Sequence, residues 1–125
     1  MIKTKKGLDL PISGIPCSEV DNSTAINSIA ILGSDYVGLK PTMMVDEGDV
    51  VCSGQKLFEN KKNPGTYITA PSSGIIKSIN RGEKRRFLSL VIDIDTSIEP
   101  TKFNVNDYAN SIDFLVDSGT LSYFR

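Results

Sequence analysis

The sequence predicts a mainly β domain of short strands, followed by a C-terminal helix (α+β). Glycine or proline recurs at short intervals up to Gly82, and turns this close leave room only for short strands. From residue 88 to 95 a large apolar side chain occupies every second position, which is the period of a strand with one buried face. Beyond Asn104 the spacing of apolar residues becomes helical.

Runs with strand character lie between the turns. In chain order they cover residues 28–32, 39–45, 50–52, 56–58, 66–70, 74–79 and 87–94. We expect residues 1–27 to form an N-terminal segment that pairs at the edge of the β unit. The chain is therefore divided into this segment, a β domain at 28–95, and a linker and helix at 96–125 that we expect to begin a further domain.

The C-terminal helix is predicted over residues 106–118. Four apolar residues recur at helical spacing and form one face: Tyr108, Ile112, Leu115 and Val116. Either Asn104 or Asn106 can cap the N-terminus, because an asparagine side chain accepts a hydrogen bond from the first turn. Gly119 suits the C-terminal end, where a left-handed residue often follows a helix.

Composition excludes several classes of function. The chain has 125 residues, 14 Lys and Arg against 15 Asp and Glu, and no histidine. The near-neutral balance argues against nucleic-acid binding, and the missing histidine excludes Ser-His-Asp and Cys-His sites and histidine-based zinc sites. Cys17 and Cys52 lack a metal-binding spacing and are expected to be buried free thiols. The longest uncharged stretch, residues 22–34, is too short and too polar to span a membrane.

Charge is distributed unevenly along the chain. Residues 63–92 carry five cations against Glu83, a net charge of +4, and residues 93–125 carry two cations against six carboxylates, a net charge of −4. Four of the cations cluster at a predicted hairpin: Arg81, Lys84, Arg85 and Arg86. This cluster is a candidate site for docking onto an acidic partner surface or phospholipid headgroups. Two alternatives stay open, namely pairing with the acidic tail of the chain and simple exposure to solvent.

Two half-motifs give the most specific local pattern. Residues 45–58 contain Gly48-Asp49 and Gly54-Gln55 turns, and residues 70–82 contain Ala70-Pro71 and, after two serines, Gly74. The pair resembles the biotinyl/lipoyl-like family, and the resemblance implies a barrel-sandwich hybrid of two interlocking sheets. In those carriers the modified lysine lies at a hairpin tip between the halves, so Lys61 or Lys62 is the corresponding candidate for a lipoyl or biotin group.

Four longer blocks resemble the N-terminal part of the A subunit of the Na+-translocating NADH:quinone reductase. They occupy residues 5–14, 32–43, 58–65 and 79–86, in the order expected for that family. The resemblance implies a peripheral protein at the cytoplasmic face of the bacterial inner membrane. The complex oxidises NADH, reduces ubiquinone and exports Na+, and its flavins and iron–sulfur centres belong to other subunits.

The resemblance thus implies a scaffold and docking module with no catalytic residue, cofactor or metal of its own. Its partners are the other subunits of the complex, and the chain is enzymatic only as part of that reductase. Tyr36, Val37 and Lys40 lie in a glycine-bounded loop and are candidates for facing a quinone or a partner protein. The alternative function is a carrier domain that presents a modified lysine, which an intact-mass measurement would reveal.

Overall fold

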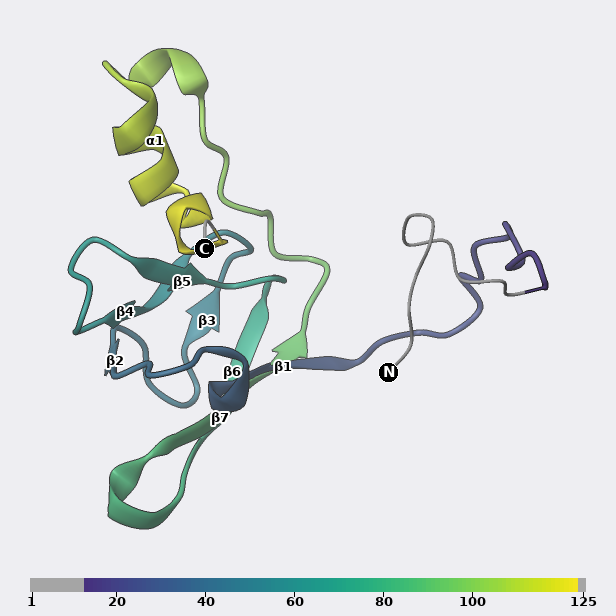
Figure 1. Cartoon of the computed structure of the whole chain (residues 1–125), viewed down its shortest axis with the longest axis horizontal. Coiled ribbons are helices and arrows are strands. Elements are labelled where there is room, and N and C mark those ends of the chain that lie inside the picture. The colour runs from purple at the N-terminus through teal and green to yellow at the C-terminus, as the bar shows by residue number, and fades with distance from the viewer. Residues whose placement is uncertain (1–12, 124–125) are drawn as a thin grey trace, which may run out of the picture.

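Two antiparallel β-sheets form the body of the molecule in the computed structural model, which describes residues 13–123 (Figure 1). The first sheet has the strand order β1-β7-β6-β3, and the second has the order β2-β4-β5. The strands are β1 (Ser28–Leu32), β2 (Pro41–Met43), β3 (Val50–Val51), β4 (Lys56–Asn60), β5 (Tyr67–Thr69), β6 (Gly74–Arg81) and β7 (Phe87–Ile94). The predicted runs at 28–32 and 87–94 are confirmed at both ends, and the other strands differ at one or both ends.

The core lies between the two sheets. It is formed by apolar side chains that are almost fully buried: Ile31, Val45, Val51, Leu57, Phe58, Ile68, Ala70, Ile76, Phe87, Leu90 and Ile92. The rings of Phe58 and Phe87 join the two sheets, with their centroids 5.3 Å apart. The predicted fold class, short strands in two sheets with a C-terminal helix, is therefore confirmed.

The two half-motifs interlock through backbone hydrogen bonds. Ile76 N donates to Asp49 O (2.9 Å), and Gly48 N donates to Ile76 O (2.8 Å). Gly54 N donates to Ala70 O at 2.8 Å, so the first turn of the first motif is tied to β6 and the second turn to the residue that follows β5. At Gly74 a side chain would collide with the backbone carbonyl of Asp93, and this close approach explains the glycine.

Strand β7 departs from the predicted alternation at its first residues. Phe87 is buried, whereas Leu88 is 42% exposed. The reason is a register shift, since Asn80 pairs with Ser89 but Arg81 pairs with Phe87, which leaves Leu88 as an extra residue in the ladder. Such a bulge turns the following side chain to the other face, and strict alternation holds only from Leu90 onward.

The predicted helix over 106–118 is wrong in its extent. The chain forms a 3-10 turn at Val105–Asp107 (η3), α1 at Ser111–Asp117 and a second 3-10 turn at Thr120–Tyr123 (η4). The break occurs because Asn110 caps α1, its side chain accepting from Asp113 N at 2.9 Å, while Asn104 caps η3.

The apolar face of the helix also differs from the prediction. Tyr108 is extended and places its ring 5.4 Å from that of Phe114, which takes the inward position. Ile112 is 66% exposed as a result. Gly119 follows the helix with a φ of +72°, as expected for its C-terminal end.

The segment 101–123 folds back over the second sheet. Thr101 N donates to Ser53 O at 2.8 Å, and Lys56 Nζ lies 2.9 Å from Asp117 Oδ1. Gly119 lies against Thr69 of β5, where an added Cβ would collide with the threonine methyl group. We call residues 101–123 the C-terminal strap.

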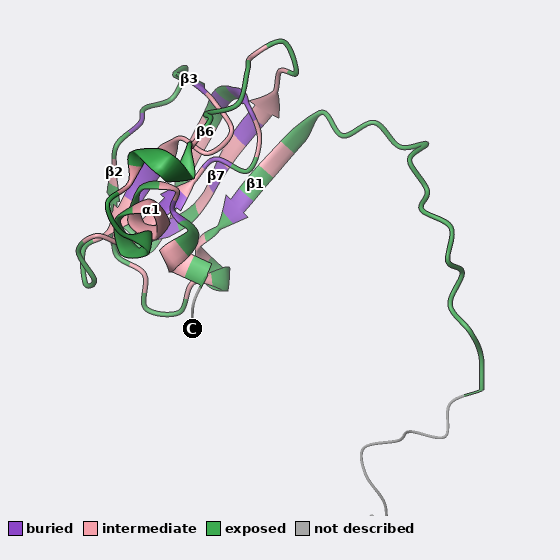
Figure 2. Cartoon of the chain, turned by 90° about the horizontal axis from the view of Figure 1, so that it is seen from above, coloured by how far each residue is buried: buried purple, intermediate pink, exposed green. Residues whose placement is uncertain are grey.

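Residues 13–27 are exposed and form no strand, and Figure 2 shows them leading away from the sandwich. Their last residue meets the sheet, where Ile94 N donates to Asn27 O at 2.9 Å. The expected pairing at the sheet edge is therefore wrong for residues 13–26, while residues 1–12, with most of the 5–14 block, lie outside the described residues. Cys17 is exposed and Cys52 is half-buried, so the prediction of two buried thiols is also wrong.

Candidate functional site

The β6–β7 hairpin carries the predicted cation cluster at a sharply turned tip. Lys84 has a φ of +52° and Arg85 a φ of +60°, and Arg86 N donates to Glu83 O at 3.1 Å. Two positive φ values at the central residues are typical of a type I′ turn. In Figure 1 this hairpin projects from the end of the molecule opposite α1.

The residues at this tip are unfavourable for the conformation that they adopt. Left-handed backbone costs an ordinary L-residue about 1–2 kcal/mol, and type I′ turns favour Asn-Gly for that reason. Lys84 and Arg85 are exposed, and neither makes an ion pair with a described residue. Their presence therefore has no explanation in the stability of the hairpin itself.

The loop that contains Tyr36, Val37 and Lys40 forms a second projecting turn. Leu39 N donates to Tyr36 O at 3.1 Å, and Gly38 has a φ of +74°, as in a type II turn. Tyr36 and Leu39 pack against the core, whereas Val37 is 99% exposed at the tip. Tyr36 and Val37 thus point in different directions, and Val37 is the apolar residue that the loop presents to solvent.

A third turn, between β4 and β5, brings Lys61 and Lys62 beside this loop. Lys61 N donates to Lys40 O at 2.9 Å. The Lys62 ammonium lies 3.3 Å from the position that a Cβ on Gly38 would occupy. The carrier-type lysine position and the predicted quinone or partner loop are therefore neighbours in space.

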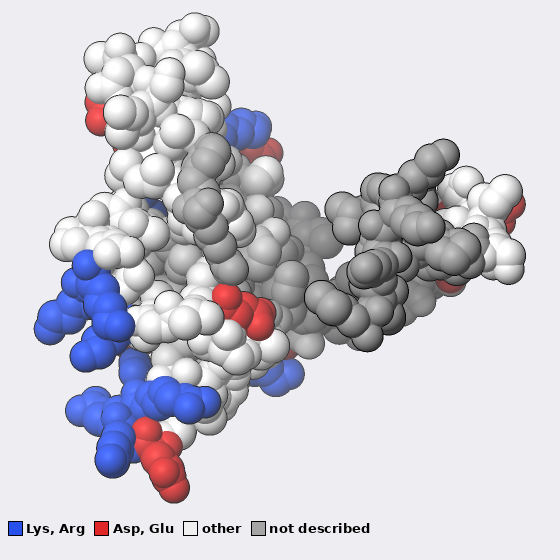
Figure 3. Space-filling model, in the orientation of Figure 1, with Lys and Arg blue, Asp and Glu red and all other residues white. Residues whose placement is uncertain are grey.

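The three turns form one basic surface. Figure 3 shows a large group of blue side chains on one side of the molecule, over the β4–β5 turn and the β6–β7 hairpin, with an acidic side chain at the hairpin and further blue side chains elsewhere. We define the basic face by six exposed residues: Lys40, Lys61, Lys62, Lys84, Arg85 and Arg86. The sequence assigned these residues to separate segments, so only the fold reveals that they share a surface.

Arg81, the remaining member of the predicted cluster, lies apart from this face. It lines a shallow depression together with Asp46 and Glu47, at the base of the hairpin. Arg86 instead lines a hollow of about 330 Å³ with Val37 and Gly38. The predicted four-cation cluster is thus divided between two places. Arg81 lies beside Asp46 and Glu47 at the base of the hairpin, and the other three cations belong to the basic face.

Ion pairing separates the cations of the molecule into two groups. Residues 13–123 contain ten Lys and Arg: Lys40, Lys56, Lys61, Lys62, Lys77, Arg81, Lys84, Arg85, Arg86 and Lys102. Lys56, Lys77 and Lys102 pair with Asp117, Asp93 and Glu99, respectively. Every paired cation lies outside the basic face, and no member of the face pairs with a described carboxylate.

The ion pairs also show which cations the acidic tail, residues 93–125, contacts. Asp117 pairs with Lys56 of β4, and Asp93 pairs with Lys77 of β6. Neither contacts the hairpin tip. Among the described residues the tail therefore stabilises its own surroundings, and the alternative in which it neutralises the hairpin cations is wrong.

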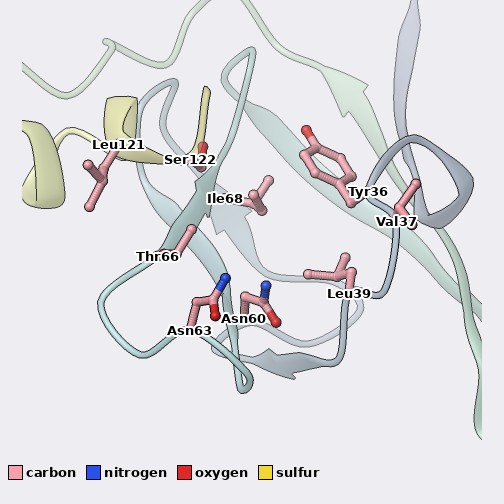
Figure 4. Close-up of a pocket in the computed structure, with 9 residues that line it drawn as sticks. All are labelled: Tyr36, Val37, Leu39, Asn60, Asn63, Thr66, Ile68, Leu121 and Ser122. Carbon is pink, nitrogen blue, oxygen red and sulfur yellow. The ribbon is translucent and has the colours of Figure 1, made fainter. Parts of the chain in front are cut away.

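An open groove of about 310 Å³ runs beside the Tyr36–Leu39 loop (Figure 4). Tyr36, Val37 and Leu39 form one side, and Asn63 and Thr66 of the β4–β5 turn form the other. Ile68 lies between the two sides, and Leu121 and Ser122 border the groove from the C-terminal strap. Its lining is about equally polar and apolar, which suits a protein side chain with backbone amides around it better than a purely hydrocarbon ligand.

Within residues 13–123 no three acidic or cysteine side chains are placed together as metal ligands. No helix in the same range has the length and apolar character needed to cross a bilayer.

Comparison with known proteins assigns the family. The model of the NqrA N-terminal barrel-sandwich hybrid domain matches residues 2–95, which is most of the chain. The chain belongs to this family. The match covers all seven strands of the two sheets and all six residues of the basic face, and it ends just after β7.

Three curated relatives that are similar to this chain share one name, that of the A subunit of the Na(+)-translocating NADH-quinone reductase. The A subunit of the Na(+)-translocating NADH-quinone reductase of Haemophilus influenzae strain PittEE is 58% identical over 95 residues, which is 76% of this chain and 21% of that protein. Its counterpart in Actinobacillus pleuropneumoniae serotype 5b is 47% identical over 132 residues, covering 100% of this chain and 29% of that protein. The counterpart in Yersinia pestis strain Angola is 56% identical over 95 residues. The chain therefore spans less than a third of these relatives, and the C-terminal strap is included in the Actinobacillus match.

Proposed function

We propose that this NqrA domain is a scaffold and docking module of the Na+-translocating NADH-quinone reductase. In this proposal the complex couples NADH oxidation and ubiquinone reduction to Na+ export, and the flavins and iron–sulfur centres lie in its other subunits. The domain works as a peripheral element at the cytoplasmic face of the bacterial inner membrane. It contributes a binding surface and no redox centre.

The observation that supports docking is the set of cations that pair with no carboxylate among the described residues. Lys and Arg that serve the fold are found in ion pairs here, as in half-buried Lys56 with Asp117. The hairpin tip instead holds two cations in left-handed backbone with no described carboxylate in contact. Unfavourable backbone that the rest of the fold maintains is a feature of functional positions. We assign the hairpin to an acidic surface on one of the other subunits.

Quinone binding and carrier function fit the site less well. The Tyr36–Leu39 loop presents an exposed valine beside an open groove, whereas ligand pockets for aromatic rings are mostly enclosed and apolar. Lys61 and Lys62 are exposed at a hairpin tip, as a carrier lysine must be, but they also belong to the basic face. A docking role uses both lysines and needs no modification of either.

Replacing Arg81, Lys84, Arg85 and Arg86 by serine in the full-length protein tests the proposal. All four are exposed, so we expect the thermal unfolding temperature to change little, since exposed substitutions shift stability by about ±0.5 kcal/mol each. Association with the remaining subunits should slow by roughly tenfold at low salt, and the difference should shrink as salt rises.

The matched control is K77S/K102S, which removes two exposed cations that lie outside the basic face. We expect this control to assemble at the normal rate. Equal assembly of the four-serine variant and the wild type at low and at high salt would contradict the docking function.

A further inference from the structure

The basic face surrounds one exposed apolar side chain, that of Val37. Val37 is 99% exposed at the tip of its turn, and the Lys62 ammonium lies close to the adjacent Gly38. Arg86 borders the hollow on one side of Val37. On the other side lies the open groove whose far wall includes Asn63 and Thr66. An exposed valine between two hollows, among cations that pair with no carboxylate in residues 13–123, offers both apolar contact and positive charge.

The groove has the features of a surface for a polypeptide. Asn60, Asn63 and Thr66 supply amide and hydroxyl groups along its wall, and Leu39 and Ile68 supply apolar contact. A chain lying there finds hydrogen-bond partners for its backbone as well as a place for a side chain.

We infer that an acidic segment of a partner protein lies across the basic face, with an apolar side chain seated beside Val37 in the groove. Its carboxylates contact Lys40, Lys61 and Lys62 on one side and Arg86 on the other. The inference rests on the proposed docking function and goes further, because it assigns the chemistry of the partner and adds the β4–β5 turn and Val37 to the contact surface.

A protein segment fits this face better than a lipid bilayer. The cations stand on three separate turns with two hollows of about 310 and 330 Å³ between them. A bilayer surface attracts such cations by charge alone and does not fill hollows of this size. A polypeptide segment that carries both acidic and apolar residues reaches the cations with its carboxylates and the hollows with its apolar side chains.

A fluorescent synthetic peptide that alternates Glu and Leu is the probe for this face. We expect it to bind this chain, and we expect a peptide that alternates Glu and Ser to bind about fivefold more weakly, because it lacks the apolar contact. V37S should weaken binding of the Glu-Leu peptide by about fivefold, and K61S/K62S should weaken it by about tenfold at low salt. V105S is the matched control, since Val105 is 64% exposed in the C-terminal strap, outside the basic face; it should leave binding unchanged.

Several results would overturn the inference. Equal binding of the two peptides, or no effect of V37S, would mean that charge alone attracts the probe. Binding to vesicles of phosphatidylglycerol and phosphatidylcholine without binding to the Glu-Leu peptide would assign the face to membrane. Failure of the peptide test together with slow assembly of the four-serine variant would overturn this inference and leave the docking function intact.

Discussion

Lys56 of β4 and the pair Lys84–Arg85 at the tip of the β6–β7 hairpin differ in what they do for the fold. The ammonium of Lys56 is 2.9 Å from Asp117 and 4.2 Å from the centre of the Tyr67 ring, so it holds the C-terminal strap to the second sheet. Lys84 and Arg85 occupy left-handed backbone, are exposed and pair with no described carboxylate. Lys56 at the strap raises the stability of the fold, whereas Lys84 and Arg85 lower it because they occupy left-handed backbone.

Two glycines, one in the C-terminal strap and one in the β4–β5 turn, allow the sharpest test of whether the strap packs against the second sheet. Gly119 in the strap and Gly65 in the β4–β5 turn have φ values of +72° and +85°. An added Cβ at Gly119 collides with Thr69, but at Gly65 it meets no atom within 4 Å. We expect G119A to lower the free energy of unfolding by about 3 kcal/mol and G65A by about 1 kcal/mol, since only the first adds overpacking to backbone strain.

Urea denaturation of both variants measures these losses. Similar losses for G119A and G65A would show that the strap does not pack against β5 in solution.

Truncation of a lysine to alanine should change the free energy of unfolding less than the glycine substitutions do. The loss should again be larger for the residue that contacts the strap, Lys56, than for Lys62 in the basic face. K56A removes a partly exposed ion pair and a cation–π contact, which together contribute about 1 kcal/mol. K62A removes an exposed cation that pairs with no described carboxylate, so we expect a change within about 0.5 kcal/mol. Thermal unfolding at low salt compares the two, and a K62A loss as large as that of K56A would mean that Lys62 has a stabilising partner.

The sequence predicts the β unit well because its signals are local. Turn glycines such as Gly48 and Gly54 and the alternation after Leu90 fix where strands begin and which side chains are buried. Two errors came from competing local interactions. A bulge at Leu88 reversed one side chain, and the side chain of Asn110 started the helix later than the apolar spacing indicated.

The candidate site was predictable only in parts. The sequence indicated the cation cluster and the Tyr36–Lys40 loop as separate candidates. That they share one surface with Lys61 and Lys62 depends on tertiary contacts, such as the hydrogen bond from Lys61 N to Lys40 O. The positive φ values at Lys84 and Arg85 had no signal, because the residues that favour a type I′ turn are absent there.

The double variant K84N/R85G tests most directly whether the hairpin cations serve docking rather than folding. Asn-Gly suits a type I′ turn, so we expect the unfolding free energy to rise by about 1 kcal/mol and the unfolding temperature by about 4 °C. In the full-length protein, the same variant should associate more slowly with the other subunits at low salt, because two unpaired cations are gone. Greater stability combined with slower assembly is the predicted result. Greater stability with unchanged assembly, or lower stability, would contradict the account.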